Sequence, residues 1–214
     1  MDIRGSTEGQ VISMNQRGDG RRHPALAGVE AYWQALRQGE SIPFRSQISP
    51  RGLEHALEYA FVLERIAPGI ARLRIAGSHL VALMGMEVRG MPLTAFFSAG
   101  SRPHVSDTVE SVFRDSAMAE VQLSAPRGLG RPSLEGQMLL LPLRSDNGVV
   151  DRALGCLVTD GAIGRQPRPL SLTSAEMRQP PAPAPRASEF AEAAAIYQPR
   201  PDVPYLRLVK TDRS

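Results

Sequence analysis

The sequence predicts an α+β fold, in which helices cover one face of a small antiparallel sheet. Two short strand patterns come first, in residues 61–75. A span of short helical turns and one longer amphipathic helix follow, and three more strand patterns end near Thr159. Alternation of apolar and polar residues indicates half-buried strands, whereas a period near 3.6 indicates helices. Strands and helices segregated in this way are typical of a sheet with helices on one face.

Two helices are predicted before the first strand. The first spans residues 27–38, and the second begins at Pro50, which suits the first position of a helix and follows the potential cap Ser49. The apolar residues of the first helix recur at helical spacing: Val29, Trp33 and Leu36, with Tyr32 beside them.

Turn signals connect the predicted strands. The first two strands turn at Pro68-Gly69, and the last two turn at Asn147-Gly148, which is a strong hairpin signal. A third alternating segment, residues 119–125, precedes the last pair. Glycines divide the span after the first hairpin into helical pieces of about two turns at most: Gly77, Gly85 and Gly90.

The longest amphipathic helix is predicted over residues 105–118. Its apolar side chains recur at the spacing of one helical face: Val105, Val109, Val112 and Phe113. A stripe of this kind faces a hydrophobic core. We therefore expect this helix to pack on the sheet.

Composition divides the chain into three parts. Residues 1–26 are polar and Gly-rich and are predicted to be flexible, residues 27–160 form the folded domain, and residues 161–214 form a Pro-rich linker and tail. Within the tail, residues 188–210 keep apolar positions at regular spacing. We expect that segment to fold when it docks on a surface, and the alternative is a tether without contacts.

The overall composition excludes several classes of protein. The only cysteine, Cys156, rules out an internal disulfide framework and lies in an apolar run that predicts a buried, inert thiol. No apolar run reaches the length of about 18 residues that a membrane span needs. The first residues also lack the pattern of a secretion signal. These observations predict a soluble, cytoplasmic protein with no membrane partner.

No catalytic or nucleic-acid-binding pattern is present in the sequence. There is no phosphate-binding glycine loop before a helix, no nucleophile elbow and no pair of histidines at zinc-ligand spacing. The chain is basic, with a net charge of +3 and a pI of about 9.5. Its arginines are nevertheless scattered, without a recognised nucleic-acid motif. A basic nucleic-acid-associated protein is therefore the most remote alternative, and we predict that the chain is not an enzyme.

Several short motifs in order resemble the alphaproteobacterial single-domain PAS proteins. They extend over residues 29–159 and comprise Trp33 with Leu36-Arg37, Arg45 to Pro50, Ala76 to Leu80, Gly85 to Gly90, and Leu141 to Leu143. The resemblance implies a PAS fold, with five antiparallel strands in the spatial order 2-1-5-4-3 and helices over one face. It also implies sensing or protein interaction in bacterial signalling, without an output domain of its own.

The resemblance leaves the cofactor unknown, because PAS domains bind haem, flavin, small acids or nothing. A flavin photosensor needs a cysteine on the helical span, whereas Cys156 lies on the last strand. His104, near the start of the long helix, is a remote candidate for a haem ligand. If a small-molecule pocket exists, we expect these residues to line it: Ile75, His79, Leu83, Phe97, Val109, Phe113, Leu123, Leu139 and Leu141.

Two functional hypotheses remain open at this stage. In the first, the nine residues enclose a small ligand; in the second, they simply fill the core and the domain serves protein association alone. Either hypothesis predicts a partner, which is a second copy of the chain or another signalling protein. For a homodimer, we expect the face to be formed by the aromatic and apolar side chains of the first helix: Tyr32, Trp33 and Leu36.

Overall fold

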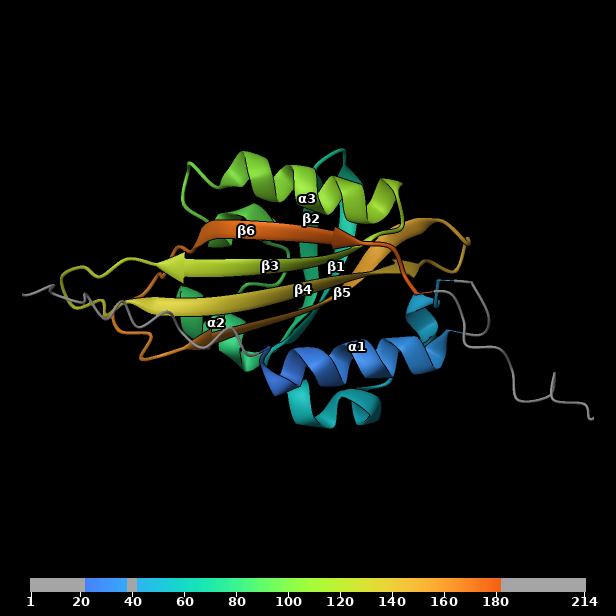
Figure 1. Cartoon of the computed structure of the whole chain (residues 1–214), viewed down its shortest axis with the longest axis horizontal. Helices are drawn as coiled ribbons and strands as arrows, with labels where there is room; N and C mark the ends of the chain where they lie inside the picture. Colours follow the sequence, from blue (N-terminus) through green and yellow to red (C-terminus); the bar gives the residue numbers. More distant parts are fainter. Residues whose placement is uncertain (1–21, 38–41, 182–214) are drawn as a thin grey trace, which may run out of the picture. The chain divides into compact units, whose positions relative to one another are not determined.

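A six-stranded antiparallel sheet forms the centre of the fold (Figure 1). The computed structural model describes residues 22–37 and 42–181. The strand order is β2-β1-β5-β4-β3-β6. The strands are β1 (Ala60–Ala67), β2 (Ile70–Ala76), β3 (Met118–Ala125), β4 (Leu134–Arg144), β5 (Val150–Asp160) and β6 (Ser171–Arg178). The predicted turns are confirmed, since Pro68-Gly69 joins β1 to β2 and Asn147-Gly148 lies between β4 and β5.

Within residues 22–37 and 42–181, three α-helices and three short 3-10 helices accompany the sheet. They are α1 (Pro24–Leu36), η1 (Arg45–Gln47), η2 (Pro50–Ala56), α2 (Ser78–Met84), η3 (Leu93–Phe96) and α3 (Arg102–Arg114). The helix expected from Pro50 forms as the 3-10 helix η2. The apolar stripe of α3 is confirmed, because all four of its members are buried: Val105, Val109, Val112 and Phe113.

The sheet has one strand more than the five that were predicted. β6 pairs with β3 from Met118↔Arg178 to Ser124↔Ser171, beyond residue 160, where the predicted domain ends. This strand lies in the segment that we had assigned to a Pro-rich linker. Its side chains are mostly exposed, so it lacks the apolar alternation that predicts a strand. An edge strand is held mainly by its backbone ladder, which the sequence does not reveal.

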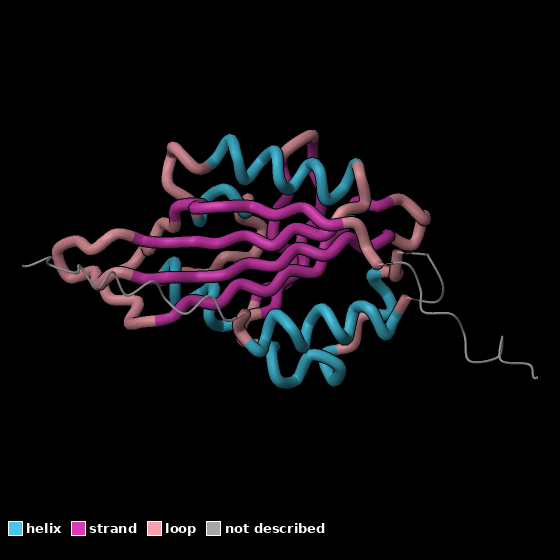
Figure 2. Tube along the Cα trace, in the orientation of Figure 1, coloured by secondary structure: helices cyan, strands magenta, loops and turns pink. Residues whose placement is uncertain are grey.

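Helices cover both faces of the sheet, so the prediction of a single covered face was wrong. α3 lies on one side of the sheet and α1 on the other (Figures 1 and 2). The reason lies in β4 and β5, whose central residues are buried at consecutive positions. A strand that is apolar on both faces needs cover on both. Neighbouring residues of β4 accordingly point to different cores, with Leu140 in one cluster and Leu139 in the other.

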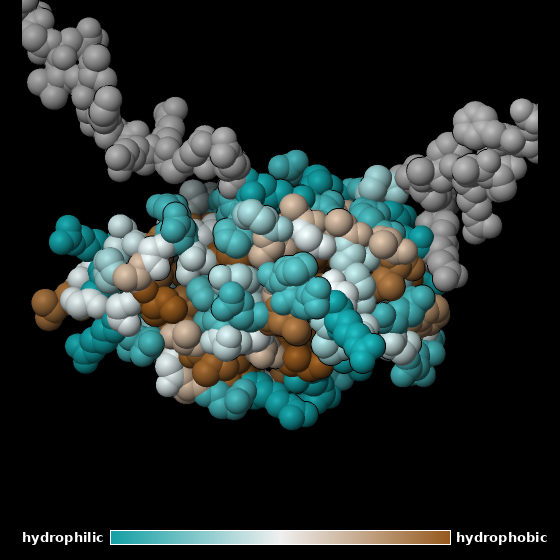
Figure 3. Space-filling model, turned by 90° about the horizontal axis from the view of Figure 1, so that it is seen from below, coloured by the Kyte–Doolittle hydropathy of each residue, from teal (hydrophilic) through white to brown (hydrophobic). Residues whose placement is uncertain are grey.

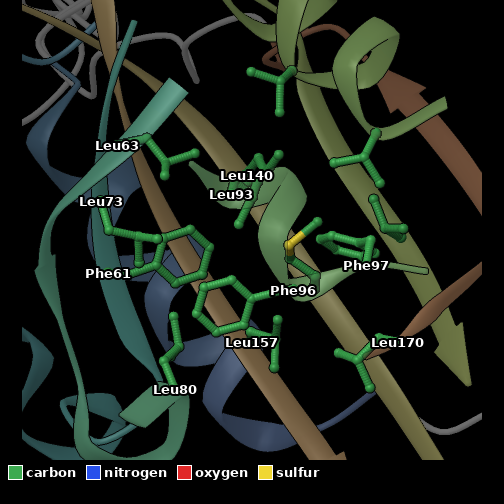
Figure 4. Packing of buried hydrophobic residues seen from close by; sticks show 14 of the residues in the cluster. Phe61, Leu63, Leu73, Leu80, Leu93, Phe96, Phe97, Leu140, Leu157 and Leu170 are labelled. Carbon is green, nitrogen blue, oxygen red and sulfur yellow. The ribbon is translucent and has the colours of Figure 1, made fainter. Parts of the chain in front are cut away.

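The first core lies between the sheet and the elements α2, η3 and α3. Phe61, Phe96 and Phe97 are at most 1% exposed there and lie among leucines of the strands (Figure 4). The ring of Phe61 lies directly on Gly155 of β5, where an added Cβ would come within 2.1 Å of the ring carbon Cζ. The glycine is therefore required for this close contact between ring and backbone.

The second core lies under α1 and η2, and it contradicts the predicted dimer face. Trp33 is fully buried in this core, and its indole N–H donates to the carbonyl of Pro142 at 2.9 Å. Tyr32 is half-buried, and its ring lies against Gly52 of η2. Leu36 is half-buried as well. Trp33 thus fills the interior, because the second face of the sheet needs it as cover.

Candidate ligand and partner surfaces

Five of the nine predicted pocket residues meet in the first core. They are Leu83, Phe97, Val109, Phe113 and Leu123, and each is at most 4% exposed. The side chains of this core come from all three elements that face the sheet there, namely α2, η3 and α3. Aromatic rings and leucines occupy the middle of this space (Figure 4). The five residues therefore belong to one buried cluster between the sheet and these elements.

Three other predicted pocket residues lie on the opposite face. Leu139 and Leu141 are buried in the second core with Trp33. Ile75 is 51% exposed and pairs with Val62 of that same core. The structure therefore does not bring the nine residues around one cavity. The alternation of side chains along β4 could have revealed this. Leu139 and Leu141 alternate with Met138 and Leu140, so the two pairs point to opposite faces of the sheet.

His79, the ninth residue, lies at the end of the sheet in the first turn of α2. Its Nε2 is 3.1 Å from the hydroxyl of Thr159, and its ring makes an edge contact with Tyr59 at 5.1 Å between centroids. Burial lowers the pKa of His79, with a smaller contribution from the charge of His23, against the opposing charge of Glu58. The folded protein therefore favours the neutral imidazole.

The remaining chemical candidates are His104 and Cys156. His104 is exposed in the first turn of α3, away from the core side of that helix. Cys156 is buried, as predicted, and burial raises the pKa of its thiol to about 12. Within residues 22–37 and 42–181, no group of three or more His, Cys, Asp or Glu side chains could hold a metal ion.

An apolar groove lies on the α1 side of the sheet. It has a volume of about 140 Å³ and runs between the η1–η2 segment and the strands β1, β2 and β5. Its lining includes Arg45, Ile48, Leu53, Leu57 and Ile75. Two of these side chains also project into solvent, since Leu57 is 45% exposed and Ile75 is 51% exposed. Figure 3 shows the molecule from below the view of Figure 1, with hydrophobic patches among hydrophilic side chains.

An ion-pair cluster lies on the β1–β2–β5 side of the fold. Glu64 pairs with Arg72, Arg74 and Arg152. Burial alone would raise the pKa of Glu64, but the hydrogen bond from Arg72 and the charges of the other two arginines outweigh it and lower the pKa. The cluster therefore stays ionised at neutral pH and joins three strands.

Comparisons with known proteins give one match to a family model and several distant structural likenesses. A model described as a PAS domain matches residues 21–158. A search of curated proteins found no match. Among solved structures, the light state of the blue-light photoreceptor Aureochrome1 LOV is 14% identical over 52% of this chain and 88% of its own, with a TM-score of 0.39.

Two further solved structures are similarly distant. An RNA-binding Light-Oxygen-Voltage receptor is 20% identical, with a TM-score of 0.40, and the likeness covers 54% of this chain and 36% of the receptor. A sensory box sensor histidine kinase from Vibrio cholerae is 12% identical over 52% of this chain and 89% of its own, with a TM-score of 0.35.

The chain belongs to the PAS domain family, since the family model matches more than half of its length. PAS domains are sensory, non-enzymatic signalling modules, and this agrees with the prediction that the chain is not an enzyme. The matched region ends within β5, so β6 is an addition to the part that defines the family. No helix of the described residues is long and apolar enough to cross a membrane.

Proposed function

We propose that this chain is a regulatory module of bacterial signalling, of the alphaproteobacterial type that its motifs resemble, and that it acts in the cytoplasm by protein association. One observation supports the proposal: buried aromatic and leucine side chains from the sheet and from the elements α2, η3 and α3 form one cluster (Figure 4). A core packed in this way contributes stability and offers little room for a ligand. The signal then passes through the outer surface of the domain.

The surface that best supports association is the apolar groove beside η2, and its occupant is a second copy of the chain. The groove has a concave apolar lining, and two apolar side chains at its edge, Leu57 and Ile75, project into solvent. In a two-fold dimer one patch faces its own copy, so the projecting side chains of each copy can enter the groove of the other. Exposed apolar patches of this kind commonly mark protein interfaces.

A charge placed in the groove tests this proposal. Ile75→Asp should weaken the dimer by about 2 kcal/mol or more, a factor of ~30 or more in the dissociation constant, because it buries a carboxylate among apolar side chains. The measurement is sedimentation equilibrium on the full chain. Ile70→Asp is the matched control, because Ile70 is 49% exposed on the same strand but does not line the groove.

Three results would contradict the proposal. The first is a wild-type chain that stays monomeric at high micromolar concentration, and the second is an Ile70→Asp variant that dissociates as readily as Ile75→Asp. The third concerns the core: native mass spectrometry of the purified protein should give the mass of the polypeptide without a bound molecule. If the wild type retains a ligand that is lost when Phe97 is replaced by Ala, the domain senses a small molecule bound in its core.

A further inference from the structure

The turn between β3 and β4 is held against the segment that leads to β6. Gly128 and Arg131 exchange backbone hydrogen bonds of 2.7 and 3.0 Å, which closes a tight turn. The amide of Arg165 donates to the carbonyl of Gly130 at 2.8 Å, and Nε of Arg131 donates back to the carbonyl of Arg165 at 3.0 Å. Two segments that are far apart in sequence therefore form one unit.

This unit contains a polar pocket with a volume of about 350 Å³. It is lined by Arg127, Gly128, Gly130, Arg131, Pro132 and Ser133. Arg127 is exposed and Arg131 is half-buried. The two glycines present no side chain to a ligand, so the backbone of the turn is open to it.

A buried arginine lies behind the pocket. Arg168 is only 2% exposed, and its Nη2 donates to the carbonyl of Pro132, a lining residue, at 2.6 Å. Its Nε is buried and has no hydrogen-bond partner among the described residues. Burial lowers the pKa of Arg168, and the charge of Arg131 lowers it further.

The positive charge of this unit is not compensated by carboxylates. Within the described parts of the chain, no ion pair is made by the four arginines near the turn: Arg127, Arg131, Arg165 and Arg168. Arg152, by contrast, pairs with Glu64 and Asp151. On the flanking strands, Glu135 and Asp160 face each other across β4 and β5 and make no ion pair within the described parts of the chain. Without a carboxylate on them, the arginines of the lining are free to pair with an anion from solution.

We infer that this pocket binds a small molecule that carries phosphate groups, through the guanidinium groups of Arg127 and Arg131. An arginine fork matches the oxygens of a phosphate with two parallel hydrogen bonds. Two guanidinium groups line the pocket, so a ligand with two phosphates can pair with both of them. The inference does not depend on the proposed dimer, since the pocket and the apolar groove share no residue.

Isothermal titration of the full chain with inorganic pyrophosphate tests the inference. We expect saturable binding at about 0.15 M salt, where long-range attraction between exposed charges is largely screened. Arg127→Gln should weaken it by ~10-fold or more, since it removes charge-assisted hydrogen bonds. This substitution should leave the fold intact, because Arg127 has no hydrogen bond or ion pair within the described residues.

Two matched variants serve as controls. Leu129→Ala alters the same turn at a side chain that is 92% exposed and does not line the pocket. Arg51→Gln removes one exposed positive charge from η2, away from the turn. Both variants should bind pyrophosphate like the wild type.

The inference is overturned by any of three results. They are the absence of pyrophosphate binding to the wild type at millimolar concentration, equal binding by the Arg127→Gln variant, and an equal loss in the Arg51→Gln variant, which would indicate attraction by net charge alone. Inorganic phosphate provides a further check. It should bind more weakly than pyrophosphate, and equal affinities would contradict a site for two phosphates.

Discussion

Trp33 is fully buried between α1 and the sheet, although on the sequence it resembles an exposed interface residue. It supplies both a large apolar ring and a hydrogen bond to the carbonyl of Pro142. Aromatic side chains bury large areas, and a buried indole N–H needs a partner. Both needs are met here within a single chain, so Trp33 contributes to folding and not to association.

Two substitutions at Trp33 should separate these contributions. Trp33→Phe keeps most of the ring but leaves the Pro142 carbonyl without its donor, so the free energy of unfolding should fall by ~1–3 kcal/mol. Trp33→Ala also removes the ring and should cost ~3–5 kcal/mol. Urea denaturation followed by circular dichroism measures both. A loss below about 0.5 kcal/mol for the alanine variant, the range of surface substitutions, would show that Trp33 is not buried.

His79 should give the domain a measurable dependence on pH. Its folded-state pKa is lowered, so on acidification the unfolded chain binds the proton first and the folded state loses stability. The free energy of unfolding should therefore fall as the pH drops through about 6.5, the ordinary pKa of histidine. Above that value both states are neutral at this residue and the effect is absent.

The pH dependence can be assigned with His79→Gln. Urea midpoints between about pH 5 and 8, the range in which histidine titrates, should slope less in this variant than in the wild type. His55 and His104 are unchanged in both proteins, and the interaction of His23 with His79 is part of the measured difference. Glu64 and Glu110 have lowered pKa values and titrate at lower pH. Identical slopes in the two proteins would refute the role of His79.

Among the elements, α3 follows its sequence most closely. Its apolar stripe faces the sheet, and Glu110 on its other side accepts a hydrogen bond from the amide of Gly69 at 2.8 Å and pairs with Arg65. The hydrogen bond from Gly69 is the main reason for the lowered pKa of Glu110, followed by the interaction with Arg65. The helix is thus tied to the β1–β2 turn as well as to the core.

A pair of substitutions on α3 should distinguish its buried and exposed faces. Phe113 is 4% exposed, so Phe113→Ala should lower the free energy of unfolding by ~3–5 kcal/mol. His104→Ala changes an exposed side chain of the same helix and should stay within about 0.5 kcal/mol. Chemical denaturation of both variants provides the measurement. Equal effects would mean that α3 does not pack through the Phe113 face.

At the scale of the whole molecule, two hydrophobic cores share one sheet. The first lies under α3 and the second under α1, and β4 and β5 contribute side chains to both. The arrangement leaves two surface features that carry the proposals, the apolar groove beside η2 and the arginine pocket at the β3–β4 turn. The predicted docking segment, residues 188–210, lies outside the described residues and stays a prediction.

Local signals in the sequence determined the elements whose formation depends on neighbouring residues. The turns at Pro68-Gly69 and Asn147-Gly148, the amphipathic face of α3 and the burial of Cys156 all follow from short-range patterns. Turn chemistry and side-chain periodicity act over a few residues, so a single sequence is enough to predict them. The motifs resembling PAS proteins added the order of the first five strands.

Only the tertiary structure decided which face each apolar residue serves and which distant segments meet. It placed Trp33 in a second core, assigned Leu139 and Leu141 to that core, and added β6 to the edge of the sheet. It also brought Arg168 behind Pro132, across 36 positions of sequence. These contacts depend on long-range strand pairing and packing, and the periodicity of one segment contains no information about the partner that will cover it.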